Sequence, residues 1–108
     1  MIEEDRWITS LKALADRSRL RIVRTLLDHA LTVNDLSERL GISQYNVSKH
    51  LRILREAGLV EATKMANRRE YAIPGQHRGQ SPGANVLDLH GLLFRFDELP
   101  AAPEKVAA

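Results

Sequence analysis

The polar side chains between Ser43 and Arg52 have the types and the spacing to read the edges of base pairs. If residues 43–57 form a helix, a projection at about 100° per residue places them opposite an apolar stripe of Val47, Leu51 and Leu54. Glutamine and asparagine amides pair with adenine, lysine favours guanine, and a serine at a helix start suits a phosphate oxygen. The residues predicted to contact nucleic acid are Ser43, Gln44, Tyr45, Asn46, Ser48, Lys49 and Arg52.

A second basic group surrounds a predicted hairpin tip. Residues 59–64 and 69–73 are short, extended-looking runs on either side of Met65-Ala66-Asn67-Arg68, which predicts a β-hairpin. Directly after two short helices such a hairpin is a wing, and cations at its tip suit the phosphate backbone or the minor groove. The predicted wing contacts are Lys64, Asn67, Arg68 and Arg69.

Helices and their caps must position both groups. Asp16, Thr32 and Ser43 stand where N-cap residues are preferred, and Asp35 completes a capping box with Thr32. Gly41 supplies a left-handed stop between the last two helices, so the segment predicts a helix-turn-helix. Apolar residues at helical spacing predict four helices, over residues 7–15, 17–29, 33–40 and 44–57.

The C-terminal third has a different pattern. Residues 74–85 are rich in Pro, Gly, Gln and Ser, which predicts a mobile connector. Residues 86–89 and 92–96 predict a second hairpin or extended arm, with a short helix from Val86 as the alternative, and the tail from Pro100 is expected to fray. The predicted fold is mainly α (α+β), a winged helix-turn-helix of about four helices and a wing over residues 1–75. Residues 76–108 are predicted to form a flexible connector and a dimerisation arm or tail.

Composition fits one compact domain. The chain has 108 residues, of which 44% are hydrophobic and 28% charged, and its net charge is +2. Its apolar runs are far shorter than the roughly 20 residues needed to cross a bilayer, and the acidic N-terminus does not resemble a secretory signal. We therefore expect a cytoplasmic protein with no membrane partner.

Metal and enzyme chemistry find little support in the sequence. The chain has no cysteine, which excludes thiolate ligands and nucleophiles. Asp88 and His90 would share one strand face and chelate a metal with help from His77 or a partner subunit, but two such groups do not complete a site. No phosphate-cradling glycine loop or nucleophile elbow is present. We expect no metal, no cofactor and no enzymatic activity.

A dimer is expected on mechanical grounds. One short recognition helix buries limited surface, so tight specific binding to DNA usually needs two copies about one helical turn apart. The first helix and the C-terminal arm carry the apolar residues assigned to this interface, which are Trp7, Ile8, Leu11, Val86, Leu89, Phe94 and Phe96.

Three segments together resemble the ArsR/SmtB family of repressors. They are LKALADRSRLRIVRTLL at 11–27, LTVNDLSERLGISQYNVSKHLRILREAGLV at 31–60 and NRREY at 67–71, and the resemblance spans residues 7–73. It implies a dimeric winged-helix protein that binds an inverted repeat at a promoter and, in many members, is released by an effector.

The chain departs from that family at two places. Metal-sensing members commonly carry a Cys-x-Cys motif where this chain has Thr32 and Asn34, whose side chains are poor ligands for soft metals. The usual long C-terminal dimerisation helix is replaced by a short, glycine-broken segment. The predicted function is a homodimeric, sequence-specific repressor that binds double-stranded DNA without the cysteine metal site, under an effector the sequence does not identify. The alternative is a winged-helix module that binds protein partners and not specific DNA.

Overall fold

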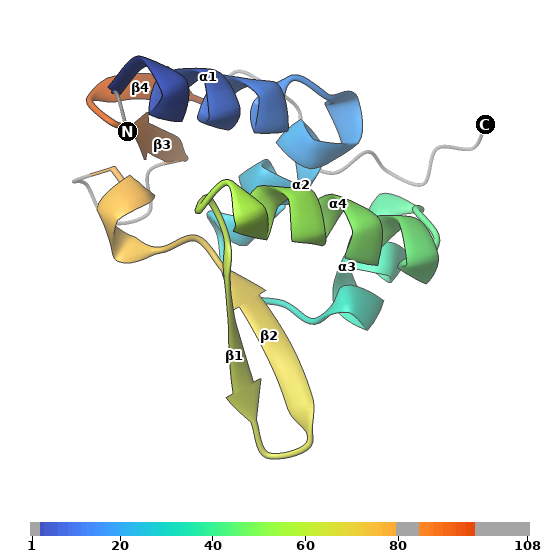
Figure 1. Ribbon diagram of the computed structural model, residues 1–108. Helices are drawn as coiled ribbons and strands as arrows, with labels where there is room; N and C mark the ends of the chain where they lie inside the picture. The colour runs from blue at the N-terminus through green and yellow to red at the C-terminus, as the bar shows by residue number, and fades with distance from the viewer. Residues whose placement is uncertain (1–2, 80–84, 97–108) are drawn as a thin grey trace.

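Four helices followed by two antiparallel hairpins make up the chain (Figure 1). The computed structural model describes residues 3–79 and 85–96. This order of elements confirms the predicted winged helix-turn-helix with a short C-terminal hairpin. The elements are α1 (Glu3–Leu14), α2 (Arg17–Leu26), α3 (Val33–Leu40), α4 (Gln44–Glu56), β1 (Glu61–Met65), β2 (Arg68–Ala72), the 3₁₀ helix η1 (Gly75–His77), β3 (Val86–Leu89) and β4 (Leu92–Arg95).

The predicted caps set where the helices begin. The Asp16 carboxylate accepts the Arg19 N–H at 3.0 Å, and the Ser43 hydroxyl oxygen accepts the Asn46 N–H at 3.1 Å. Thr32 and Asp35 form the predicted capping box, with bonds of 3.1 and 3.2 Å. Each bond satisfies an N–H that the first turn of a helix leaves without a partner, so local sequence fixes these three starts.

Two helix ends differ from the predictions. α1 runs from Glu3 to Leu14, so it begins before Trp7, the first residue of its predicted apolar stripe. α2 ends at Leu26 and not near residue 29, because Arg78 donates hydrogen bonds of 3.0 and 3.4 Å to the carbonyls of Leu27 and Leu26. A side chain about 50 residues away in the sequence therefore helps to close this helix.

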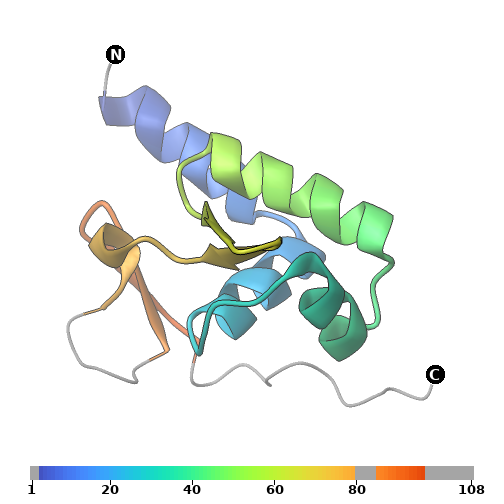
Figure 2. The ribbon, with the colours of Figure 1, turned by 90° about the horizontal axis from the view of Figure 1, so that it is seen from below.

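The core is an aliphatic cluster that all the described helices and both hairpins share. α1 and α4 lie side by side, and α2 and α3 pack beneath them (Figure 2). Val47, Leu51 and Leu54 of α4 are buried in this cluster. None of the described helices combines the length and apolar character that crossing a lipid bilayer requires.

The wing is anchored to the helical body at its base. Leu31, between α2 and α3, exchanges two backbone hydrogen bonds with Tyr71 of β2, at 3.1 and 2.8 Å. The buried residues Leu59 and Val60 lead from α4 into the core before β1 begins. β1 and β2 therefore leave the body from a fixed base and project away from it (Figure 1).

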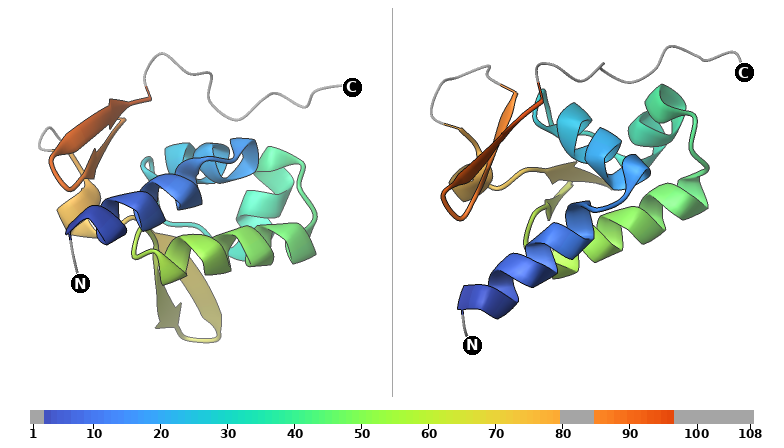
Figure 3. Two further views of the ribbon diagram at one scale, coloured as in Figure 1. Left: turned by 45° about the horizontal axis from the view of Figure 1, so that its top comes forward. Right: turned by 90° about the horizontal axis from the view of Figure 1, so that it is seen from above.

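The C-terminal hairpin belongs to the same packed unit, so the predicted division of the chain at residue 75 is wrong. Leu87, Leu89 and Phe96 are buried in the shared core, and the hairpin lies beside the N-terminal half of α1 (Figure 3). The segment forms a hairpin and not the alternative helix from Val86. Residues 80–84 of the predicted connector and the tail from residue 100 lie outside the described residues.

Gly41 provides a test of how tightly the turn between α3 and α4 is specified. Its φ is +68°, and a Cβ built there meets nothing within 4 Å, so conformation alone determines the effect of a substitution. We expect Gly41→Val to lower the free energy of unfolding by about 1–2 kcal/mol, and Gly41→Asn by less, because asparagine tolerates left-handed backbone. Urea unfolding of both variants measures this, and equal losses for valine and asparagine would contradict it.

Candidate nucleic-acid interface

α4 has one face in the core and one in solvent, as its sequence predicts. The predicted contact residues Ser43, Gln44, Tyr45, Asn46, Ser48, Lys49 and Arg52 are all exposed. The side chain of Tyr45 is 75% exposed, which is high for an aromatic residue with no role outside the protomer. The structure thus brings the seven residues together on one open surface.

One of these side chains is already held by a neighbour that the sequence analysis did not assign to the site. The Gln44 amide donates a 2.8 Å hydrogen bond to the side-chain oxygen of Asn34 on α3. This bond fixes the orientation of the Gln44 amide and leaves its oxygen as the acceptor available to a partner. Asn34 is therefore a positioning residue for the start of α4.

The wing places like charges directly opposite each other. Lys64 on β1 pairs with Arg69 on β2 in the strand register, and both are exposed. Like charges at opposed positions destabilise a sheet, so this pair weakens the isolated wing. Arg68 donates a 2.9 Å bond to Glu70, and Asn67 lies in the turn after Ala66, whose φ is +57°.

A hollow of about 300 Å³ separates the exposed face of α4 from the wing. Ser48 and Arg52, both predicted site residues, line it together with Glu56. Arg55 and Tyr71 complete its wall and were not among the site residues predicted from the sequence. For Arg55 the signal was present, because positions 48, 52 and 55 follow the i, i+4, i+7 spacing of one helical face.

Most cations on this surface have no acidic partner in the protein. In the part of the chain that the structure describes, the ion pairs here are Arg52–Glu56 at 3.4 Å and Arg68–Glu70 at 2.9 Å. Within that same part, no carboxylate pairs with the remaining cations, which are Lys49, Arg55, Lys64 and Arg69. The surface formed by α4 and the wing is therefore positively charged and suits an anionic partner.

Behind α4, a small polar cluster joins three helices. Arg19 donates to the Ala13 carbonyl at 2.6 Å and to His50 Nδ1 at 3.2 Å, and the Asp16 carboxylate lies 3.9 Å from the same nitrogen. Burial by itself raises the pKa of Asp16, but the Arg19 backbone N–H that it accepts and the positive charge of Arg19 outweigh burial, so the pKa is lowered. His50 thus has a packing role.

The positions of the family's cysteine motif do not fit a metal here. The Thr32 hydroxyl oxygen is engaged in the capping box, and the Asn34 oxygen accepts from Gln44. Among residues 3–79 and 85–96, no three histidine or acidic side chains come together as a metal-binding group. The predicted shared face of Asp88 and His90 is also wrong, because His90 lies in the hairpin turn with φ +53°, and Asp88 accepts the Gly91 N–H at 2.8 Å.

The predicted dimer residues divide into surface and core. Ile8 and Leu11 of α1 are 49% and 41% exposed, and Trp7 is half-buried against His90. Val86 and Phe94 are also half-buried. The assignment of Leu89 and Phe96 to an interface is wrong, because both side chains are buried inside the protomer.

The arrangement of α3, α4 and the wing defines a class of protein. A helix-turn-helix followed by a hairpin beside the exposed face of its second helix is a winged helix-turn-helix. The family model described as "Bacterial regulatory protein, arsR family" matches residues 16–62. The chain belongs to this ArsR family.

Individual relatives agree with the assignment. The chain is 40% identical over 75 residues to the transcriptional regulator CmtR of Mycobacterium tuberculosis. The matched segment covers 69% of this chain and 64% of CmtR. It is 44% identical over 66 residues to the transcriptional activator HlyU of Vibrio cholerae, covering 61% of each. The chain thus spans less than two-thirds of the length of these curated relatives.

Solved structures agree with both the fold and the family. HlyU from Vibrio cholerae superposes with a TM-score of 0.63 at 39% identity, over 69% of this chain and 83% of that one. The homodimeric winged helix-turn-helix DNA-binding domain of a Mycobacterium bovis protein gives a TM-score of 0.64 at 32% identity, over 67% of each chain.

The two capping carboxylates predict how stability depends on pH. The pKa of Asp35 is lowered by the Thr32 N–H and hydroxyl, and the pKa of Asp16 is lowered as described above. As the pH falls, these two carboxyl groups take up protons in the unfolded chain before they do so in the folded protein. Their contribution to the free energy of unfolding is therefore fully present above the unfolded-state pKa of about 4. It is lost as the pH falls through the lower pKa values of the folded state. We expect the free energy of unfolding to fall in this acid range.

The double variant Asp16→Asn, Asp35→Asn isolates the charge, because asparagine also caps helices. We measure the free energy of unfolding in urea at a series of acid pH values. As the pH falls, we expect this free energy to decrease less steeply for the variant than for the wild type. Glu38→Gln, an exposed change on α3, is the matched control and keeps the wild-type slope. Parallel slopes for the double variant and the wild type would contradict the assignment.

Proposed function

We propose that this protein is a homodimeric, sequence-specific DNA-binding regulator that represses transcription from an inverted-repeat operator. The observation that carries the proposal is the joint surface of α4 and the wing, where seven exposed polar residues adjoin cations without acidic partners. Membership of the ArsR family supports it, as does the similarity to a transcriptional regulator and to a homodimeric DNA-binding domain. Its site of action is the cytoplasm, where bacterial DNA lies.

α4 is the element that reads sequence in this proposal. Its aliphatic stripe is held in the core, so its polar side is presented as a rigid unit of the size that a major groove admits. Gln44 and Asn46 supply acceptors and donors for adenine edges, and Lys49 supplies a donor for guanine. Ser43 and the first-turn N–H groups face a phosphate oxygen.

The wing supplies affinity more than specificity. Lys64 and Arg69 stand opposite each other at a cost to the sheet, and a phosphate between them removes that repulsion. Arg68, held beside Glu70, presents its guanidinium next to them. The wing therefore fixes the register of α4 along the duplex, as phosphate contacts generally do.

Two protomers are required for two half-sites. Ile8 and Leu11 form the exposed apolar part of α1, and we assign them to the dimer interface. A dimer bound across a promoter excludes polymerase by occupancy, which requires only DNA binding and therefore favours repression. Thr32 and Asn34, which stand where metal-sensing members carry cysteines, favour a signal other than a soft metal.

Single alanine variants test the DNA interface. We expect Lys49→Ala and Arg68→Ala each to weaken binding to the region upstream of the protein's own gene. Arg68→Ala is also expected to reduce the slope of log affinity against log salt by about 1, because it removes one neutralised phosphate, whereas Lys49→Ala is expected to relax specificity at the guanine that it contacts. Lys12→Ala, an exposed cation on α1, is the control and leaves both unchanged. Gel-shift titrations at several salt concentrations measure this.

The same titrations distinguish the two predicted functions. Equal affinity for all four proteins would overturn the assignment of the interface. Binding that hardly changes with salt would favour the alternative, a module for protein partners.

Charged substitutions on α1 test the dimer. We expect the double variant Ile8→Glu, Leu11→Glu to be monomeric, because four buried carboxylates would otherwise face each other across the interface. Met65→Glu, a change at a 48% exposed apolar residue of the wing, is the control and stays dimeric. Light scattering gives the mass and circular dichroism the helix content; a folded double variant that remains dimeric would reject this interface.

A further inference from the structure

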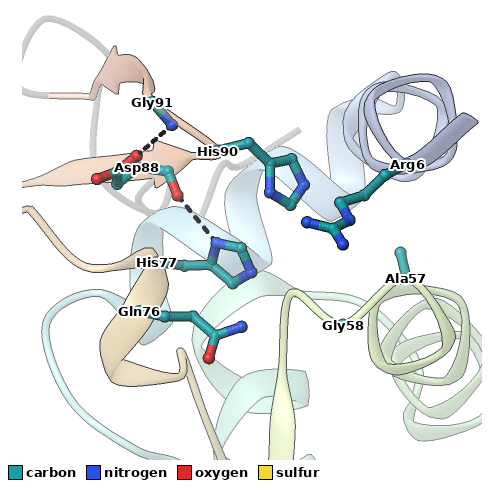
Figure 4. A pocket seen from close by; sticks show the side chains of 8 residues that line it. All are labelled: Arg6, Ala57, Gly58, Gln76, His77, Asp88, His90 and Gly91. Atoms are coloured by element: carbon teal, nitrogen blue, oxygen red, sulfur yellow. Dashed lines mark hydrogen bonds between the residues drawn. The ribbon is translucent and has the colours of Figure 1, made fainter. Parts of the chain in front are cut away.

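The histidines of one cavity hold elements of the protein together. This cavity, of about 500 Å³, opens between α1, the end of α4, η1 and the turn of the C-terminal hairpin (Figure 4). His77 donates from Nδ1 to the Asp88 carbonyl at 2.9 Å. His90 Nε2 lies 3.2 Å from the Ser10 hydroxyl oxygen, and Arg6 also has a partner within the protein. The bonds around this cavity thus join the C-terminal hairpin to η1 and α1.

The hollow of about 300 Å³ between α4 and the wing is lined differently. Ser48 and Arg55 of α4 and Tyr71 of β2 belong to its lining. Among the residues that the structure describes, none forms a side-chain hydrogen bond or ion pair with the hydroxyl of Ser48, the guanidinium of Arg55 or the hydroxyl of Tyr71. Tyr71 is only 8% exposed, and a tyrosine hydroxyl buried to this degree usually has a partner. The hollow therefore offers a ligand one cation and two hydroxyl donors.

The one carboxylate in the lining of this hollow is already neutralised. Glu56 accepts a 3.4 Å hydrogen bond from Arg52, one helical turn before it on α4. Because the charges of Arg52 and Glu56 offset each other, Arg55 gives the hollow its net positive charge. A planar guanidinium binds a phosphate group in bidentate fashion, and hydroxyl groups donate to the remaining phosphate oxygens. The lining thus has the chemistry of a phosphate site.

The position of the hollow matches the path of one DNA strand in the proposed complex. In that complex α4 reads the major groove, and the tip of the wing contacts the backbone or the adjacent minor groove. A single chain of phosphates separates a major groove from the minor groove beside it. A protein that spans this chain with α4 on one side and the wing on the other holds the chain between the two elements, which is where the hollow lies.

We propose that this hollow is a phosphate site that binds one backbone phosphate of duplex DNA in each half-site, through Arg55, Ser48 and Tyr71. The proposal rests on the proposed function and adds Arg55 and Tyr71 to its interface. Backbone hydrogen bonds of 3.1 and 2.8 Å tie Tyr71 to Leu31, so the phosphate is bound at the base of the wing, which the helical body holds in place. A phosphate bound there sets the position of α4 in the groove.

Two variants of the phosphate site have different expected effects on DNA binding. We expect Arg55→Gln to weaken binding to the region upstream of the protein's own gene about tenfold, and to reduce the slope of log affinity against log salt by about 1, because one neutralised phosphate is lost. Tyr71→Phe keeps the buried ring and removes only the hydroxyl. We expect it also to weaken binding about tenfold, for one lost hydrogen bond to a charged group, but with an unchanged salt slope.

Gel-shift titrations at several salt concentrations measure both quantities, and circular dichroism confirms that each variant folds. Lys12→Gln is the matched control, because it removes an exposed cation from the last turn of α1, as Arg55→Gln does from the last turn of α4. We expect this control to keep the wild-type affinity and slope. If the wild type binds DNA and Arg55→Gln matches it in affinity and slope, the phosphate site is wrong and the proposed function stands. If the wild type binds no DNA, both proposals fail.

Phosphate ethylation interference locates the contact on the DNA. Ethylation of the upstream fragment neutralises single phosphates, and fragments that are ethylated at a contacted phosphate are depleted from the complex. In each half-site we expect a phosphate whose ethylation interferes with binding of the wild type but not of Arg55→Gln, because the variant lacks the group that contacts it. Identical patterns for the two proteins, as expected if the hollow holds a free anion or no ligand, would overturn the phosphate site.

Discussion

The burial of one side of α4 is the interaction on which the rest of the structure depends. Val47, Leu51 and Leu54 are inserted into a core to which every described helix contributes, so α4 has no freedom to rotate about its axis. The polar residues between these positions then face solvent as a consequence of helical geometry. A single packing requirement therefore both stabilises the fold and orients the surface that we assign to DNA.

The wing shows a different balance between stability and function. Its base is tied to the body through the hydrogen bonds between Leu31 and Tyr71, whereas its outer part places Lys64 against Arg69. A sheet selected only for stability would not keep this pair. The wing tolerates the repulsion between Lys64 and Arg69 because the Leu31–Tyr71 hydrogen bonds hold its base. The repelling pair indicates that the outer part of the wing binds an anionic partner.

Local signals explain which features were predictable from sequence. N-caps, the capping box and the left-handed glycine act within a few residues, so the starts of α2, α3 and α4 follow from the sequence directly. The end of α2 does not, because Arg78 reaches it from a distant segment. The alternation of apolar and polar residues indicated that Leu89 and Phe96 lie on an apolar face of the C-terminal segment. It did not indicate that their own protomer buries this face. The sequence analysis grouped His77 with His90, and their ring centroids lie 5.5 Å apart, but no local pattern places Arg6 of α1 at the same pocket.

The position of Phe96 in the core has a consequence for how the protein is made. Leu87, Leu89 and Phe96 close one side of a cluster whose other members lie between residues 13 and 73. Synthesis proceeds from the N-terminus, so the helices emerge from the ribosome with that side still open to water. Folding of the whole unit is complete only after the last strand has emerged, and a chain truncated before it would display an apolar surface to other nascent chains.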